Sequence, residues 1–296
     1  MRGRDWVGKA TLALAFAALL LIGFLIGARW RRRLPPPRPR LLAAFLAVGT
    51  GDCTLIRTPD GHAALIDAGP AEAGPVVART LHQQGIRSLD LLVLAAPAAG
   101  SIGGVPGLLD NSVTVRQAWD NGVADTGEAR RAARAALRVR NVPVQVAHRG
   151  DRVFLGSRGA RLAVLWPPEH GARAHTDALV CRLDYGETGI VLAGPADGVE
   201  EAYLVSSAGE SLSCDVLEVA AGGADSATSA ELLRRATPAV AVISGAPSAP
   251  PGPGTLHRLQ AAGAGIWRTD TLGAITMFSD GHGPPIVTGA HMDAHK

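Results

Sequence analysis

The stretch that decides the fold is LLVLAAPAAGSIGG, which runs from Leu91 to Gly104. Its first four residues are apolar, as expected for a strand that is buried on both faces. A loop of small residues follows and ends in two consecutive glycines. Zinc binds nitrogen, sulfur or oxygen donors, and the alanine and glycine side chains of this loop supply none. We therefore expect no metal ligand among the alanines and glycines of this loop.

The composition indicates a domain with a full hydrophobic core. Of the 296 residues, 47% are hydrophobic, 19% are charged and only 4% are aromatic, so we expect a core of Leu, Val, Ile and Ala. Cys53, Cys181 and Cys214 each lie in an apolar run and form no C-x-x-C pattern. We expect buried thiols at these positions, and one disulfide is the alternative.

The net charge of +3 conceals an uneven distribution. Basic residues dominate positions 1–40, where Asp5 is the one acidic residue, whereas acidic residues outnumber basic ones over positions 41–296. Contacts with phosphate groups provide much of the affinity for nucleic acid. A mildly acidic folded domain is therefore not expected to bind nucleic acid.

Residues 10–28 (ATLALAFAALLLIGFLIGA) carry no charge, and Trp6 and Trp30 flank them. A helix of this length spans about 28 Å, close to the hydrocarbon thickness of a bilayer. The sequence therefore predicts one N-terminal transmembrane helix, preceded by a basic flank at residues 1–9. A cleaved signal peptide is the alternative, but arginines follow the span where a small-residue cleavage site would be needed.

The two flanks of the span predict its orientation. Three basic residues precede the span and six arginines follow it, which favours a cytoplasmic C-terminal side. Residues 29–40 include LPPPRPR and are expected to form an extended Arg/Pro-rich stalk. We expect a single-pass protein of the inner or cytoplasmic membrane with membrane lipid around its helix. An extracytoplasmic domain is the alternative.

Short apolar runs and helical patterns alternate over residues 41–282. This order predicts an α/β (α+β) fold with two mixed β-layers and outer helices, followed by a tail at 283–296. We expect helices at Glu72–Gln84, Glu128–Arg140, Ala227–Arg235 and Thr255–Ala262. We expect strands at Leu41–Val48, Cys53–Arg57, Ala63–Ile66, Asp90–Leu94, Val144–Ala147, Arg161–Trp166, Ala178–Leu183, Ile190–Leu192, Asp215–Val219, Ala239–Ile243, Gly265–Arg268 and Ala274–Phe278.

An ordered series of motifs resembles one known family. AVGTGDCTLIRTPDG (47–61), LIDAG (65–69) and GIRSLDLLVLAAPAAGSIGG (85–104) are followed by LWPPEH, DALVCRLDYG, IVLAGPADG and DVLEVAAGGADSATS. In this order they resemble the metallo-β-lactamase-like domain of ComEC-type competence proteins, which carry DNA across bacterial membranes. The resemblance covers roughly residues 41–282. It implies a four-layer αββα sandwich and, in active members, a zinc- or manganese-dependent hydrolase.

The chain departs from that family at the ligand positions. The opening Asp is replaced by Ala47, and Asp52 and Asp67 remain at the mouth of the site. The positions of the expected ligands, which together form the predicted vestigial pocket, are Ala96, Ala98, Gly100, Ser101, Pro195, Ala221, Gly222 and Pro250. We therefore expect no metal ion, no cofactor and no catalytic residue here.

Other candidates have simpler explanations. Asp67 is expected to accept backbone hydrogen bonds at a strand end and Asp52 to cap a turn, although paired carboxylates could act as acid and base. His170, His175 and Asp177 are expected to lie in a solvated loop, with a metal site as the alternative. Arginines 130, 134 and 138 share one face of a helix, where we expect solvent and where phosphate or anionic lipid is the alternative.

These observations predict a membrane-anchored pseudoenzyme that works as a binding or scaffold module with an unknown protein partner, linked to DNA uptake. A hydrolase or nuclease with a non-standard site is one alternative. A small-molecule sensor that uses the emptied pocket is another.

Overall fold

The computed structural model describes residues 40–123, 127–168, 178–207 and 209–290. The chain divides into two compact units, Met1–Arg38 and Pro39–Lys296, and the first of these lies outside the described residues. The predicted transmembrane segment 10–28 is among the residues not described. Within the described ranges, no helix is long and apolar enough to cross a membrane.

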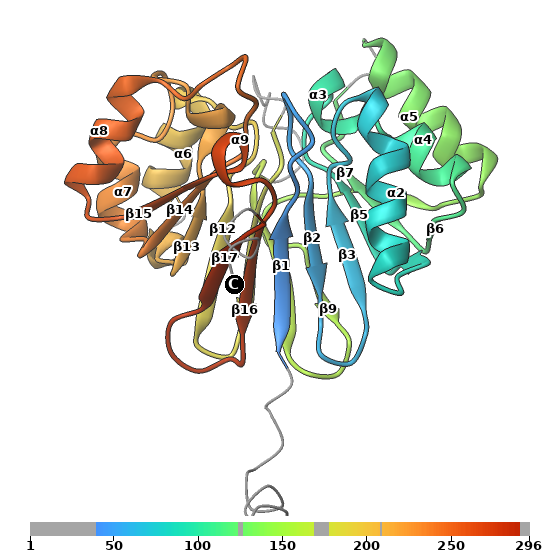
Figure 1. Cartoon of the computed structure of the whole chain (residues 1–296), viewed down its shortest axis with the longest axis horizontal. Helices are drawn as coiled ribbons and strands as arrows, with labels where there is room; N and C mark the ends of the chain where they lie inside the picture. The colour runs from blue at the N-terminus through green and yellow to red at the C-terminus, as the bar shows by residue number, and fades with distance from the viewer. Residues whose placement is uncertain (1–39, 124–126, 169–177, 208, 291–296) are drawn as a thin grey trace, which may run out of the picture. The chain divides into compact units, whose positions relative to one another are not determined.

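Two mixed β-sheets form the centre of the second unit (Figure 1). In the first sheet the strand order is β17 (Ile286–Gly289), β16 (Ile275–Ser279), β1 (Leu41–Phe45), β2 (Thr54–Arg57), β3 (Ala63–Ile66), β5 (Leu91–Leu94), β7 (Ala118–Asp120) and β8 (Val144–Val146). In the second sheet it is β15 (Gly265–Arg268), β14 (Val240–Ile243), β13 (Val216–Glu218), β12 (Thr188–Leu192), β11 (Val180–Tyr185), β10 (Ala160–Trp166) and β9 (Arg152–Leu155).

Each sheet has an antiparallel half and a parallel half. Strands β3, β5, β7 and β8 run parallel, as do β12 to β15, and helices connect the strands of these halves. Over the first sheet lie α2 (Gly74–Gln83), α3 (Ala99–Ile102), α4 (Val105–Asp110) and α5 (Glu128–Val139), and over the second lie α6 (Gly198–Ser207), α7 (Ala230–Ala236) and α8 (Pro253–Ala261) (Figure 1). The shorter elements are β4 (Ser88–Leu89), β6 (Thr114–Val115), α9 (Thr269–Leu272) and three 3-10 turns, Ala71–Ala73, Gly209–Leu212 and Ala220–Gly223.

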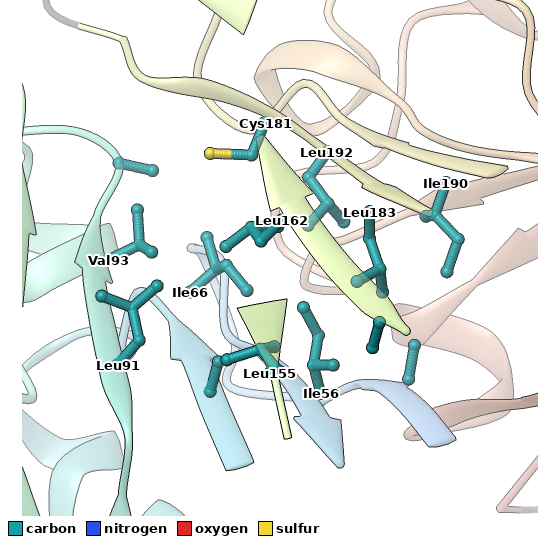
Figure 2. Packing of buried hydrophobic residues seen from close by; sticks show 14 of the residues in the cluster. Ile56, Ile66, Leu91, Val93, Leu155, Leu162, Cys181, Leu183, Ile190 and Leu192 are labelled. Atoms are coloured by element: carbon teal, nitrogen blue, oxygen red, sulfur yellow. The ribbon is translucent and has the colours of Figure 1, made fainter. Parts of the chain in front are cut away.

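The two sheets pack face to face through one apolar cluster (Figure 2). Ile56 and Val93 of the first sheet and Leu162 and Ile190 of the second belong to this cluster and are almost fully buried. Two further clusters lie between each sheet and its own helices. Because every layer buries apolar side chains against the next, the architecture is a four-layer αββα sandwich. This confirms the expected fold class for the folded domain.

Local predictions from the sequence agree well with the observed elements. The strand runs at 41–48, 63–66 and 90–94 and the helix at 128–140 are confirmed within a few residues. Ser229 caps α7, where its side chain accepts a hydrogen bond from the Leu232 N–H. Cys53, Cys181 and Cys214 are buried free thiols.

Several regions differ from the sequence interpretation, which did not include strand β7 or the helices α4 and α6. Ile286–Gly289 pairs antiparallel with β16, so part of the expected 283–296 tail is an edge strand of the first sheet. Arg152–Leu155 forms the edge strand β9, which the sequence analysis did not predict. Both segments are short, and their apolar residues do not extend into a long run, so the pattern signal is weak.

Candidate functional site

The small-residue loop after β5 turns directly into helix α3. Ala96 is buried at the end of the strand, whereas Ala98 is exposed at the start of the helix. Gly100 and Ser101 lie within α3, and Ser101 is almost fully buried. The Ser101 carbonyl accepts a hydrogen bond from the Ala68 N–H at 2.7 Å, which ties the helix to the segment after β3.

Helix α3 packs so tightly against the β1–β2 turn that residue 100 has no room for a side chain. A Cβ atom at Gly100 would lie 2.7 Å from the Thr50 carbonyl oxygen. In the reverse direction, a Cβ atom at Gly51 would lie 1.9 Å from the Gly100 carbonyl oxygen. Both distances are shorter than van der Waals contact allows, so glycine is required on both sides of this contact. Any side chain at position 100 would force the two loops apart.

A pocket of about 420 Å³ opens beside this contact, between the ends of the two sheets. Its wall unites five residues that the sequence analysis assigned to the vestigial site: Asp52, Pro195, Ala221, Gly222 and Pro250. Thr50 and Ser244 add two hydroxyl-bearing side chains to the lining. Gly100 lines a separate pocket of about 590 Å³ that shares Thr50 with the first. Ala96, Ala98 and Ser101 line neither pocket.

The donor set of the smaller pocket does not suit a metal ion. Pro195, Ala221, Gly222 and Pro250 carry no side-chain atom that coordinates zinc or manganese, which leaves Asp52 as the one carboxylate in the wall. Across the described ranges of the chain, no three His, Cys, Asp or Glu side chains are grouped to hold a metal. His170, His175 and Asp177 lie outside those ranges. The described residues therefore do not fit the zinc or manganese that the family resemblance implies.

Three carboxyl groups interact electrostatically in this region, and one of them lines the pocket. Asp67, between β3 and the first helical turn, and Glu218, on β13, are almost fully buried, and Asp52 lines the pocket. Thr54 of the first sheet donates from Oγ1 to Glu218 Oε1 at 3.2 Å, so this contact bridges the two sheets. The Ala95 N–H donates to Asp67 Oδ1 at 2.7 Å, which confirms the expected backbone hydrogen bond of Asp67.

Burial and mutual repulsion raise the pKa of these carboxyl groups. Burial, and then the charge of Asp52, raise the pKa of Glu218 from its usual 4.5 to about 8. Burial and the same neighbour also raise the pKa of Asp67 well above its usual value. Burial raises the pKa of Asp52 to about 6, and the nearby Ser244 side chain partly opposes this rise. At pH 7 Glu218 is thus mostly neutral and Asp52 is mostly ionised.

Sequence reasoning missed Glu218 and Ser244. A usable signal existed for Glu218, because it is a lone acidic residue inside the apolar run VLEVAA. Such a residue in a buried strand must find a partner or remain protonated. Asp52 and Ser244 line the same pocket but lie almost two hundred positions apart in the sequence, so no local pattern predicts that they meet.

The basic face of α5 is not simply solvated as expected. Arg130 is 1% exposed and donates from Nη2 to Asp120 Oδ1 at 2.5 Å and from Nη1 to Asn121 Oδ1 at 2.8 Å. Arg134 Nε lies 3.4 Å from the other oxygen of Asp120. Arg138 is exposed. Two of the three arginines therefore anchor α5 to the end of β7; Arg130 is closed to solvent, whereas the Arg134 side chain is 28% exposed.

Comparison with known proteins identifies the fold. No protein-family model matches the chain, and no curated protein sequence matches it. Among solved structures, the metallo-β-lactamase fold protein YhfI from Bacillus subtilis matches 78% of this chain and 96% of its own, with 10% identity and a TM-score of 0.50. CmlA, a diiron β-hydroxylase from Streptomyces venezuelae, matches 79% of this chain and 53% of its own, with 14% identity and a TM-score of 0.50. The folded domain therefore has the metallo-β-lactamase fold.

Proposed function

We propose that this protein is a membrane-anchored binding module that uses the metallo-β-lactamase fold without metal-dependent catalysis. One observation carries the proposal: the pocket beside Asp52 is walled by Pro195, Ala221, Gly222 and Pro250, at positions where the resembled family holds ligands. A metal-dependent hydrolase relies on an ion to lower the pKa of water from 15.7 to about 7. These four residues have no side-chain atom to hold such an ion.

The packing at Gly100 supports the same proposal. This position corresponds to a ligand Asp in the resembled family, and a Cβ atom here would meet the Thr50 carbonyl oxygen at 2.7 Å. Restoring a carboxylate at this position would therefore require the loop to move. The loss extends beyond the ligand side chains to the space that one of them would occupy.

The chemistry of the pocket indicates what it receives. Its volume of about 420 Å³ lies within the usual range of ligand pockets, roughly 300–1,000 Å³. The walls are small and uncharged except for Asp52, and the Ser244 hydroxyl lies beside that carboxylate. We infer that the occupant presents a cationic or hydrogen-bond-donating group to Asp52. Either a small molecule or the side chain of a protein partner has this chemistry.

The membrane anchor and the location belong to the proposal and rest on the sequence. We propose that residues 10–28 form a single span, because they carry no charge, and the arginines at 29–33 favour a cytoplasmic domain. Protease added to intact spheroplasts is expected to leave the domain uncut and to digest it after lysis. Digestion before lysis would place the domain outside the cytoplasm.

The absence of catalysis is tested on the full chain, purified in mild detergent from medium that contains zinc and manganese. By elemental analysis we expect less than one metal ion per several chains. We also expect no EDTA-sensitive hydrolysis of DNA or of a chromogenic β-lactam. An active metallo-β-lactamase-fold nuclease is the positive control. Stoichiometric metal together with EDTA-sensitive turnover would replace this proposal with a hydrolase that uses a non-standard site.

Binding at the pocket is tested by capture from native membranes. We expect the wild type to retain its partner or ligand and Asp52→Asn to lose it, because the ionised acceptor is removed. Asp110→Asn is the matched control, since the Asp110 side chain is 74% exposed on another face. Equal capture by wild type and Asp52→Asn would show that binding occurs outside this pocket.

The proposed link to DNA uptake rests on the sequence resemblance. An unchanged transformation frequency in a deletion strain would contradict this link.

A further inference from the structure

A group of arginines gathers on the outer face of the second sheet, away from the pocket described above. Arg152 on β9, Arg161 on β10 and Arg182 on β11 come from three neighbouring antiparallel strands. In the strand register, Ala163 of β10 pairs with Arg152 on one side and with Arg182 on the other. Directly paired residues project from the same face of a sheet, so the two arginines flank the alanine.

A small hollow lies among these arginines because Ala163 has only a methyl group. Its volume is about 230 Å³, and Arg149, from the loop before β9, adds a fourth guanidinium to the lining. Arg161 lies two residues before Ala163 and therefore on the same face of β10. The hollow thus has an alanine in its lining and four guanidinium groups around it, and it shares no residue with the pocket at Asp52.

Several contacts hold the arginines in place. Arg182 donates from Nε to Asp184 Oδ1 at 2.6 Å and from Nη1 to the Ser211 carbonyl at 2.9 Å. Its guanidinium lies over Gly189, where a Cβ atom would come within 2.5 Å of Nη2. Arg161 donates from Nη2 to Asp184 Oδ2 at 2.7 Å. Two of the guanidinium groups are therefore oriented before any ligand arrives.

The charges in the hollow do not balance within the described residues. Asp184 is the one carboxylate that pairs with these arginines, and it serves both Arg161 and Arg182. Arg149 donates to the Ser207 carbonyl, which is uncharged, and Arg152 is exposed and has no ion pair in the described part of the chain. Guanidinium groups bind phosphate oxygens through paired hydrogen bonds, which makes this arrangement suited to a phosphate group.

We propose that this hollow binds the phosphate of a phosphomonoester. A volume of about 230 Å³ is smaller than the usual pocket for a whole ligand, so it takes one charged group of a larger molecule. Phe154 pairs with Arg161 in the register and is 63% exposed on the same face. Its ring offers a stacking or apolar surface to the rest of the ligand. A free nucleotide and a phosphatidic acid headgroup both carry this phosphate chemistry.

The test uses the full chain in neutral detergent and isothermal titration with inorganic phosphate, AMP and adenosine. We expect phosphate and AMP to bind and adenosine not to bind. Arg152→Gln is expected to weaken AMP binding at least tenfold, because it removes a guanidinium that forms no ion pair with the described residues and is exposed to an incoming anion. Arg158→Gln is the matched control: Arg158 is exposed in the adjacent β9–β10 turn, outside the hollow, and carries the same charge. Phe154→Ala is expected to weaken the binding of AMP and to leave the affinity for inorganic phosphate unchanged.

Three outcomes would overturn the proposal: no binding of phosphate, of AMP or of phosphatidic acid; measurable and equal affinity for AMP and adenosine; or equal weakening by Arg152→Gln and Arg158→Gln. The last would mean that net charge alone attracts the anion. A parallel experiment uses lipid nanodiscs with and without phosphatidic acid. The wild type could bind nanodiscs that contain phosphatidic acid and not bind AMP. If Arg152→Gln then abolished the nanodisc binding, the result would support the phosphate site and identify the lipid as its ligand. Melting curves of each variant confirm that the fold is retained.

Discussion

Replacing Glu218 with glutamine is expected to remove a large part of the pH dependence of stability. The folded chain holds the Glu218 proton up to a pKa of about 8, whereas the unfolded chain releases it near 4.5. Between these two values the folded state binds more protons than the unfolded state, so the free energy of unfolding decreases as the pH rises. The stability that this group provides is fully present below pH 4.5 and is lost as the pH rises through about 8.

The size of the effect follows from the shift in pKa. Each pKa unit corresponds to about 1.4 kcal/mol, so the shift of Glu218 has a ceiling on the order of 5 kcal/mol across this window. Glutamine has no charge to lose, and its carbonyl oxygen can still accept the hydrogen bond from Thr54. An unpaired amide N–H would lower the whole stability curve by a constant amount. The informative quantity is therefore how the difference between Glu218→Gln and the wild type changes with pH.

The assay is urea unfolding of the full chain in mild detergent, followed by tryptophan fluorescence at pH 5, 6, 7, 8 and 9. We expect the difference to shift by several kcal/mol in favour of Glu218→Gln between pH 5 and pH 9. Asp110→Asn, at a mostly exposed carboxylate, is expected to follow the wild-type curve. Parallel curves for the wild type and Glu218→Gln would refute the argument that burial keeps this carboxyl protonated.

Two further substitutions test the packing that shapes the site, both by melting temperature and urea unfolding. Gly100→Ala should lower the free energy of unfolding by about 1–3 kcal/mol, because the added Cβ atom meets a carbonyl oxygen of the β1–β2 turn. The control Gly265→Ala, whose added Cβ atom has ordinary contacts, should change this free energy by less than about 0.5 kcal/mol. Equal effects of the two substitutions would contradict the close approach at Gly100. Arg130→Ala should lower the free energy of unfolding by about 3–5 kcal/mol, because it leaves the buried Asp120 without its closest partner. Arg138→Ala, at an exposed arginine of the same helix, is the control. A similar loss in that control would show that the buried pair is not responsible.

The sequence alone predicted most of the local structure of the folded domain. The run Leu91–Leu94 forms a buried strand and Glu128–Val139 forms a helix, because both patterns depend on residues that are neighbours in the chain. The order of strands and helices also predicted two β-layers with outer helices. Alanine side chains have no donor atoms in any fold, so the lack of ligands at Ala96 and Ala98 follows from residue identity alone.

Only the tertiary structure decided which distant residues meet. Thr54 and Glu218 form a hydrogen bond across 164 positions, and Arg152 and Arg182 flank Ala163 through the register of three strands. Hydrophobic periodicity is a local signal and shows which face of a strand is buried, whereas the register of one strand on another depends on packing over the whole sheet. For that reason the sequence identified most of the long strands, while the buried carboxyl groups and the arginine-lined hollow became evident only in the assembled sandwich.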